Sequence, residues 1–426
     1  MLPRPLASVI GFACLACLYL AAVGGDTVRT THARRDAAAV ARVRGASPIV
    51  RTTRTGPHPF AVAVDARVGR VFVLTSGTIA VGVTVEPRGP FGVNVLDART
   101  GAALETLPLG GTGLALDSRT GRVFILDVGP TDIVGVGRRP GRVSVLDART
   151  GRLIRRVSVG RGPRAAAVDE RTGRVFVVNR DDGTVSVLDA ATGAVLRTTG
   201  VDPSPRAVAV DERTRRVYVA CSAFQGGSVA ALDAATGATE PINAVLPRPV
   251  GSVAVDEQAD RVIASDPNTR GSESPGTPET YIIDGATGVV ARTVEIPGTL
   301  VATDGHTGRA FIVYVPDPYN AATEGSVVQT LATRGGQLLQ TVPVAASPLT
   351  FLYGAAIAVA VRAGRVIVAN PDTDNVSVLD ARSGRVVRHI GVGHEPQTVV
   401  VDEQTARIFV ANAGDNTVSM LDAARL

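Results

Sequence analysis

Residues 164–205 read RAAAVDERTGRVFVVNRDDGTVSVLDAATGAVLRTTGVDPSP, and this stretch decides the fold. It contains four short apolar runs, AAAVD, RVFVV, TVSVLD and AVLRTT, separated by turns rich in Asp, Gly and Thr. Each run is rich in Val and about as long as one strand, and none shows the 3.6-residue period of an amphipathic helix. The stretch therefore predicts a four-stranded antiparallel meander.

The same unit recurs along the chain at a spacing of about 41 to 57 residues, which is typical of a repeat architecture. Because apolar residues make up 45% of the chain and aromatic residues only 4%, Ala and Val must fill the core. Eight units are found. Except in the seventh unit, where Ala360 occupies the position, an Asp ends the first run of each: Asp65, Asp117, Asp169, Asp211, Asp256, Asp304 and Asp402.

These aspartates are predicted to be turn residues rather than acid/base groups or metal ligands. In the turn DERTG, the Asp169 carboxylate can accept backbone N–H groups while Gly173 adopts the left-handed conformation. The third run ends in the same way, except at Ala332 in the sixth unit: Asp97, Asp147, Asp189, Asp233, Asp284, Asp380 and Asp422. An Arg begins every second run and is expected to pair with these carboxylates: Arg70, Arg122, Arg174, Arg216, Arg261, Arg309, Arg365 and Arg407.

The two ends of the repeat array predict how it closes. The eighth unit, residues 397–426, stops after its third run, whereas IVRTT at 49–53 is nearly identical to VLRTT at 195–199, a fourth run. A missing outer strand would leave an exposed sheet edge that is prone to pair with other chains. Residues 49–54 are therefore expected to complete the last sheet and close a ring. The predicted fold is an all-β propeller of eight four-stranded blades, with seven blades as the alternative.

The N-terminal region is expected to direct export. Residues 1–23 have the layout of a secretory signal, and their apolar run is also long enough to span a bilayer uncleaved, so both readings stay open. Residues 24–46 are an Arg/Ala-rich linker, and residues 47–426 form the propeller. The protein is thus expected to be secreted, periplasmic or on the cell surface, or tethered to the membrane by this segment.

Charge and cysteine content exclude some functions. The net charge is +5, but residues 24–54 hold seven Arg against two Asp, so the remainder is close to neutral and no nucleic-acid partner is expected. Cys14 and Cys17 lie within the N-terminal apolar run, and Leu18 stands where haem attachment needs His. Cys221 is the one other cysteine, which leaves no internal disulfide in the propeller.

Several second runs carry a known signature: RVYVAC at 216–221, RVFVVN at 174–179, RVIVAN at 365–370 and RIFVAN at 407–412. They resemble the YVTN-type β-propeller repeat, which combines such a strand with a following V-S-V-[IL]-D and a preceding P-x-x-V-A-V-[DN]. The resemblance covers residues 47–426. It implies an exported or surface propeller, with lactonase-like relatives, but no single activity, because a fold alone does not define a function.

Two sets of loops are candidates for a binding site. The loops 75–91, 127–141, 265–280 and 314–325 are long and lie on the face opposite the Asp-Gly turns, which makes that face uneven. The linkers between blades open onto the central channel. There the sequence places the candidate ligand-binding residues, whose alternative role is that of solvated loop residues: His58, Arg164, Arg206, His394, Glu395 and Gln397.

Imidazole, carboxylate and guanidinium groups around one opening would suit a ligand that carries a carboxylate or phosphate. No GxSxG elbow, HExxH pair, phosphate-binding loop or dinucleotide fingerprint is found, so no catalytic residue, metal or cofactor is assigned. The favoured function is a monomeric, non-enzymatic scaffold that binds an unknown protein or small anionic ligand. The alternative is a lactonase-like hydrolase, which requires His58, Glu395, Arg164 and Arg206 to converge with shifted pKa values.

Overall fold

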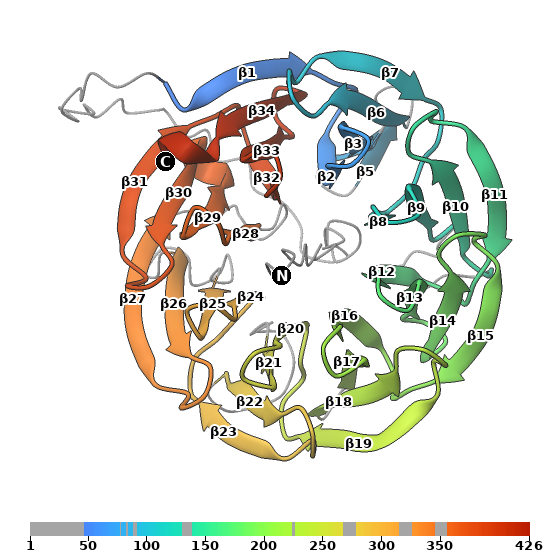
Figure 1. Ribbon diagram of the computed structural model, residues 1–426, viewed down its shortest axis with the longest axis vertical. Coiled ribbons are helices and arrows are strands. Elements are labelled where there is room, and N and C mark those ends of the chain that lie inside the picture. The colour runs from blue at the N-terminus through green and yellow to red at the C-terminus, as the bar shows by residue number, and fades with distance from the viewer. Residues whose placement is uncertain are drawn as a thin grey trace, which may run out of the picture.

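The protein is described by a computed structural model that covers residues 47–426 except 77, 82–83, 88–91, 130–138, 224–225, 267–277, 315–325 and 346–355. Eight four-stranded antiparallel sheets stand around a central axis as the blades of a propeller (Figure 1). The predicted eight-bladed fold is confirmed, and the seven-bladed alternative is wrong. The predicted signal or anchor at 1–23 and the linker at 24–46 lie outside the described residues.

The first four blades run in chain order from the innermost to the outermost strand. Blade 1 contains Pro59–Asp65 (β2), Arg70–Thr75 (β3), Gly92–Asp97 (β6) and Ala103–Leu107 (β7). Blade 2 contains Gly113–Asp117 (β8), Arg122–Asp127 (β9), Arg142–Asp147 (β10) and Leu153–Ser158 (β11). Blade 3 contains Pro163–Asp169 (β12), Arg174–Asn179 (β13), Thr184–Asp189 (β14) and Val195–Gly200 (β15). Blade 4 contains Pro205–Asp211 (β16), Arg216–Ala223 (β17), Gly226–Asp233 (β18) and Thr239–Leu246 (β19).

The other blades follow the same plan, and only the last departs from chain order. Blade 5 contains Ser252–Asp256 (β20), Arg261–Ser265 (β21), Thr280–Asp284 (β22) and Val290–Val294 (β23). Blade 6 contains Leu300–Asp304 (β24), Arg309–Tyr314 (β25), Ser326–Ala332 (β26) and Leu338–Ala345 (β27). Blade 7 contains Ile357–Ala360 (β28), Arg365–Asn370 (β29), Asn375–Asp380 (β30) and Val386–Gly391 (β31). Blade 8 contains Pro396–Asp402 (β32), Arg407–Asn412 (β33), Thr417–Asp422 (β34) and Ile49–Arg54 (β1).

Three smaller elements complete the described part. Thr78–Val81 (β4) and Thr84–Pro87 (β5) form a two-stranded hairpin after β3. Pro371–Thr373 (η2) and Ala423–Arg425 (η3) are single turns of 3-10 helix. No helix within the described residues is long and apolar enough to cross a membrane.

The ring closes as the sequence predicts. Strand β1 pairs antiparallel with β34, with Thr52 opposite Ser419 and Thr53 opposite Val418. The Asp422 N–H also donates to the Pro48 carbonyl over 2.9 Å. The first described strand therefore forms the outer edge of the last blade, where blue and red ribbons meet in Figure 1. This pairing covers the edge that β34 would otherwise expose.

The core consists of eight hydrophobic clusters, one between each pair of adjacent blades. The blades converge toward the axis, so small residues such as Ala165 and Ala166 suit the innermost strands. The third residue of each second strand is large and almost fully buried: Phe72, Phe124, Phe176, Tyr218, Ile263, Phe311, Ile367 and Phe409. These side chains fill the spaces between blades that the small inner-strand residues leave.

The predicted turn role of the aspartates is confirmed. Asp169 is fully buried, and its Oδ1 accepts the N–H groups of Arg171 and Thr172 over 2.9 and 3.1 Å. The predicted ion pairs form in five blades: Arg122–Asp147, Arg174–Asp189, Arg261–Asp284, Arg365–Asp380 and Arg407–Asp422. The prediction is wrong for Arg70 and Arg216, which pair with Glu105 and Glu240 on the outermost strands. Ala332 stands opposite Arg309 and offers no carboxylate.

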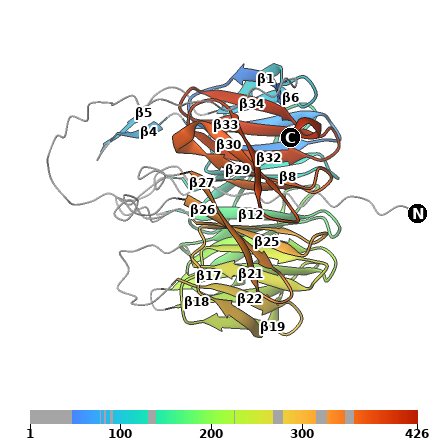
Figure 2. The same ribbon diagram turned by 90° about the vertical axis from the view of Figure 1, so that its left-hand side faces the viewer.

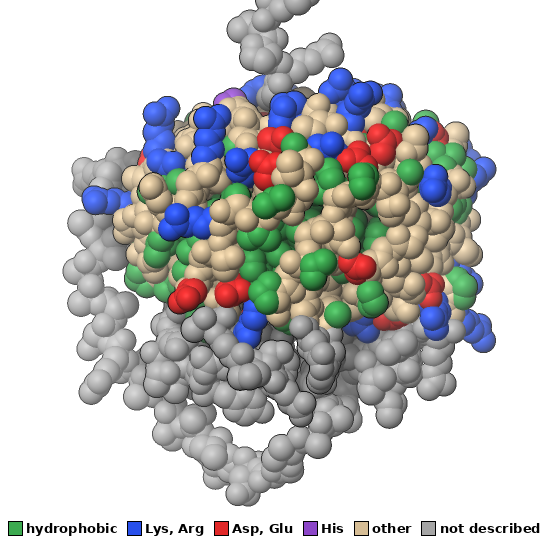
Figure 3. Space-filling view, turned by 90° about the horizontal axis from the view of Figure 1, so that it is seen from below, with side chains coloured by type: hydrophobic (Ala, Val, Ile, Leu, Met, Phe, Trp, Pro, Cys, Tyr) green, Lys and Arg blue, Asp and Glu red, His purple; other side chains and the backbone are tan. Residues whose placement is uncertain are grey.

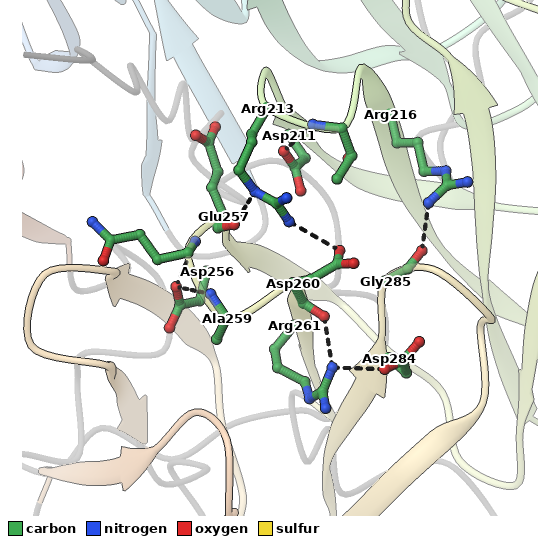
Figure 4. Close-up of polar contacts among 12 residues, drawn as sticks. Asp211, Arg213, Arg216, Asp256, Glu257, Ala259, Asp260, Arg261, Asp284 and Gly285 are labelled. Carbon is green, nitrogen blue, oxygen red and sulfur yellow. Dashed lines mark hydrogen bonds and ion pairs between the residues drawn. The ribbon is translucent and has the colours of Figure 1, made fainter. Parts of the chain in front are cut away.

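Adjacent blades are also joined through these turns. Between blades 4 and 5, Arg213 donates to the Glu257 carbonyl, and Arg216 donates to the Gly285 carbonyl over 3.3 Å (Figure 4). Three glutamates, which we call the glutamate ladder, continue this pattern. Each accepts a backbone N–H from the preceding blade: Ser118 to Glu170 (2.9 Å), Glu170 to Glu212 (3.2 Å) and Glu212 to Glu257 (3.1 Å).

The middle member of the ladder should make stability depend on pH. Burial, followed by the charge of Asp169, raises the pKa of Glu212 from 4.5 to about 7. Since the folded pKa exceeds the unfolded one, stability from this group is full below pH 4.5 and is lost as the pH rises through 7. A Glu212→Gln variant keeps an acceptor for the Glu170 N–H without the charge. We expect it to melt higher than the parent at pH 8, with the difference disappearing near pH 5.

A Glu212→Ala variant is the matched control, because it removes both the charge and the acceptor. It leaves the half-buried Glu170 N–H without its partner and should melt below Glu212→Gln at both pH values. Thermal unfolding followed by circular dichroism measures each difference. A Glu212→Gln variant that melts below the parent at pH 8 would show that the charged form stabilises the ladder.

Candidate functional site

The propeller has two unlike ends. We call the end where first strands turn into second strands, and third into fourth, the turn face, and the opposite end the loop face. The β4–β5 hairpin projects from the loop face, at the left of Figure 2. Most of the long loops at 75–91, 127–141, 265–280 and 314–325 lie outside the described residues. The described part of the loop face is therefore chiefly the linkers and the ends of the inner strands.

Four inner strands carry a β-bulge at their second residue. In β12, Pro163 pairs with Asn179 and Ala165 with Val178, so Arg164 is skipped. A bulge redirects the side chain of the extra residue and often occurs beside a functional site. Since these strands line the axis, the redirected residues lie at the loop-face mouth of the channel: Phe60, Arg164, Arg206 and Gln397.

The sequence explains this local structure. Each bulged residue follows a Pro, which lacks an N–H and begins the strand. The residue before that Pro has positive φ: 44° at His58, 63° at Gly162, 57° at Ser204 and 51° at Glu395. Three of the four are not glycine, and a left-handed non-glycine residue costs about 1–3 kcal/mol that the surrounding structure must offset. The linker backbone is thus strained where the predicted site lies.

Contacts from the preceding blade hold the strained linkers in place. The Asp374 Oδ1 in blade 7 lies 2.8 Å from His394 Nδ1 and accepts the Glu395 N–H over 3.1 Å. The Asn416 Oδ1 in blade 8 accepts the His58 N–H over 2.8 Å. The hydrogen bond to Asp374 raises the pKa of His394, whose side chain is 59% exposed. An exposed, charged imidazole therefore stands at the mouth at mildly acidic pH.

The two predicted arginines form a second group. Arg164 and Arg206 are half-buried second residues of β12 and β16, which pack against each other in adjacent blades. Burial, together with the charge of Arg180, lowers the pKa of Arg206. Within the described residues the Arg206 Nε is buried without a hydrogen bond. An anion bound at this position would offset both the burial and the repulsion.

The structure therefore divides the predicted site residues into two groups. His58, His394, Glu395 and Gln397 come from blades 8 and 1, whereas Arg164 and Arg206 come from blades 3 and 4. Blade 2 stands between the groups on one side (Figure 1). Within the first group, His394 Nε2 lies 3.9 Å from Glu395 Oε1. The arrangement suits an extended ligand that reaches across the mouth.

Sequence reasoning missed other polar groups on this face. Arg248 in the linker to blade 5 pairs with Asp266 over 3.2 Å, and their side chains are only 14% and 5% exposed. Beside them the Tyr281 hydroxyl donates to Glu279, and burial raises the pKa of Tyr281. No group of three or more His, Cys, Asp or Glu residues in the described part is arranged to hold a metal ion.

The described residues form an eight-bladed β-propeller. The first described strand closes its ring, and polar groups lie at one mouth of its channel. Comparison with known families narrows the class further. The chain belongs to the family of the outer membrane protein assembly factor BamB, whose model matches residues 91–309, more than half of the chain. This match establishes a propeller family, while the YVTN-type resemblance stays an expectation.

Solved structures show the same fold at low sequence identity. BamB from Moraxella catarrhalis is 16% identical, with a TM-score of 0.55, and the match covers 88% of this chain and 99% of that one. Kuenenia stuttgartiensis hydrazine synthase is 18% identical, with a TM-score of 0.52, and the match covers 72% and 94%. No curated protein matches the chain. At such identities the likeness concerns the fold alone.

Proposed function

We propose that this protein is an exported, non-enzymatic β-propeller that binds another protein through its loop face. Membership of the BamB family supports a protein-binding scaffold. The observation that carries the proposal is the set of bulged inner-strand residues at the channel mouth. Four blades repeat one strained Pro-containing linker, and the bulged position after it holds three kinds of side chain: Phe60, Arg164 and Arg206, and Gln397. Variation on a fixed backbone is what a recognition surface needs.

The chemistry of the mouth favours an anionic ligand. Arg164 and Arg206 lie on neighbouring strands. Burial and the positive charge of Arg180 both disfavour the charged form of Arg206 and lower its pKa. A carboxylate or phosphate group would form charge-assisted hydrogen bonds with such guanidinium groups. An acidic segment of a partner protein fits this site and also spans toward His394. A small anionic ligand is the simpler form of the same proposal.

We infer the cellular location of the protein and its repeat group from the sequence. The apolar run in residues 1–23 supports an extracytoplasmic protein, either released or tethered, and the family description refers to the outer membrane. The propeller is proposed to act as a monomer and to belong to the YVTN-type repeat group within the wider class of propellers. No nucleic acid, metal or cofactor enters this proposal.

A lactonase-like hydrolase is the second candidate function, and it rests on His394 instead of the convergence of His58 and Glu395 with Arg164 and Arg206 that the sequence led us to require. His394 favours it, because Asp374 orients its imidazole over 2.8 Å and Glu395 lies beside it. A carboxylate-oriented histidine is a common general base. In this case His394→Gln would abolish turnover of a lactone or ester, whereas a binding scaffold shows no turnover with either chain.

The main proposal is tested by capture from the envelope fraction with the full chain as bait. We expect an Arg164→Gln, Arg206→Gln double variant to retain at most about one tenth of the captured partner, because two charge-assisted contacts are lost. The matched control removes two exposed arginines of the outer strands of blades 3 and 5, Arg197→Gln and Arg292→Gln, and should capture as the parent does. Equal capture by all three chains would refute a loop-face site. A parallel panel of lactones and esters tests the hydrolase.

A further inference from the structure

The turn face carries an uneven distribution of arginine. The last turn and outer strand of blade 2 carry four exposed arginines: Arg149 and Arg152 in the turn, and Arg155 and Arg156 on β11. Within the part of the chain that the structure describes, none of these four guanidinium groups has a hydrogen bond or ion pair. Their charge is therefore available to a partner outside the molecule.

The same character continues through the neighbouring blades. Blade 1 adds Arg99, and blade 7 adds Arg382, Arg385 and Arg388, all exposed. Blade 8, which lies between blades 7 and 1, contributes Arg51 and Arg425. We call these exposed arginines of blades 7, 8, 1 and 2 the basic arc. It follows the outer rim of the turn face for half of the ring (Figure 1).

Most carboxylates of the same rim are already paired with arginines that begin the second strands. Asp147 pairs with Arg122 over 2.8 Å and Asp380 with Arg365 over 3.1 Å. Glu105 likewise pairs with Arg70 over 2.9 Å. The acidic groups thus do little to compensate the arc, which keeps a net positive charge.

The last turns on the opposite side of the rim carry fewer arginines, with Arg334 in blade 6 as the exposed one. The corresponding turns of blades 3, 4 and 5 read DAATG at 189–193, DAATG at 233–237 and DGATG at 284–288, with no arginine. Figure 3 shows the side of blades 4 and 5, where the wall between the two edges is mainly uncharged, while arginines and carboxylates lie together along the turn-face edge. A one-sided positive rim would orient the protein on a negatively charged surface.

Exposed aliphatic side chains are interspersed with the arginines. Val50, Leu104, Ile154 and Val387 are 44 to 50% exposed. Each is the residue skipped at the bulge of an outer strand, so the backbone directs it outward. Alternating arginine and aliphatic residues suit the interface of a bilayer, where charges meet headgroups and apolar side chains enter between them.

The chain also enters the propeller within this arc. The Pro48 carbonyl accepts the Asp422 N–H, and the Arg425 Nη1 donates to the Ser47 carbonyl over 3.4 Å. The sequence just before it, residues 24–46, holds five more arginines and follows the apolar run of residues 1–23. A tether leaving at this point would bring the arc, rather than the loop face, to the membrane.

We propose that the basic arc docks on the surface of an anionic lipid bilayer, with the turn-face rim of blades 7, 8, 1 and 2 against the headgroups. Phosphate groups pair with the arginines, and the bulged aliphatic residues enter the interface. The loop face is then directed away from the membrane and is open to a partner. This inference does not depend on which ligand the loop face binds.

The test is flotation with vesicles of phosphatidylcholine, with and without phosphatidylglycerol. The full chain is compared with a chain that begins at residue 24, which keeps every described strand and therefore the closed ring. The shorter chain should bind the anionic vesicles only, and high salt should release it. An Arg149→Gln, Arg152→Gln, Arg155→Gln, Arg156→Gln variant should bind at least about tenfold more weakly, since each arginine near an anionic surface contributes on the order of 1 kcal/mol.

The matched control removes four exposed arginines outside the arc, Arg139, Arg142, Arg197 and Arg292, by the same change to Gln. It should bind as the parent does, and unchanged melting of both variants shows that the fold persists. Equal binding by the two quadruple variants would overturn the proposal, as would equal binding to both vesicle types. Loss of binding to a short DNA duplex in the arc variant, without vesicle binding by the parent, would instead assign the arc to nucleic acid.

Discussion

A chain that begins at residue 55 is expected to lose the cooperative unfolding of the parent and to associate with other copies. This truncation removes β1, so the backbone N–H and C=O groups of β34 that face it lose their partners. It also removes the nearly buried Thr53, whose hydroxyl donates to the Gly101 carbonyl over 2.6 Å and so joins blade 8 to blade 1. An uncovered edge of this kind pairs readily with other chains. Size-exclusion chromatography and thermal unfolding measure the loss.

The control for this truncation is a chain that begins at residue 24. It keeps β1 and should remain monomeric, with the melting temperature of the parent. A synthetic peptide of residues 47–56 added to the shorter chain should restore part of the transition, because the register with β34 is preserved. A chain from residue 55 that stays monomeric and melts like the control would show that closure does not stabilise the ring.

Replacement of Phe176 by alanine is expected to lower the free energy of unfolding by about 3–5 kcal/mol, the usual cost of truncating a buried phenylalanine. The side chain is fully buried in the cluster that joins blades 3 and 4, together with Val217 and Val219. The cavity would lie between two sheets whose backbones are fixed by their own hydrogen bonds. The surroundings therefore have little freedom to close it. Denaturant unfolding measures the change.

Two further variants show whether the loss of stability comes from the buried position of Phe176. Phe176→Leu keeps most of the volume and should cost less than Phe176→Ala. Leu196→Ala removes a side chain that is 51% exposed and should change stability by less than about 0.5 kcal/mol. If Phe176→Ala behaved like Leu196→Ala, the interface between blades would contribute little to stability.

The features that sequence reasoning predicted are those determined within one repeat. The period of the apolar runs and the Asp-Gly turns define each blade, because strand length and turn chemistry are local. Closure was predictable because IVRTT at 49–53 repeats the pattern of VLRTT at 195–199. The pairing of Arg174 with Asp189 followed for the same reason, since both residues lie at the ends of neighbouring strands.

Contacts between blades were not predictable in this way. The approach of His394 to Asp374 depends on the angle at which blade 8 meets blade 7, and no local pattern encodes that angle. The same holds for Arg248 and Asp266. The glutamate ladder did leave a signal, because Glu170, Glu212 and Glu257 each follow the Asp that ends an inner strand. A glutamate at that place in successive repeats indicates a contact with the preceding blade.

Blade 8 combines strands from two distant parts of the chain, and this affects how the ring forms during synthesis. Residues 49–54 are synthesised long before their partner at 417–422. The initial strand must wait unpaired while more than 360 intervening residues are made. Its composition, IVRTTR, places two charges in a six-residue segment and so discourages aggregation during that delay. Closure of the ring is thus timed by the synthesis of β34.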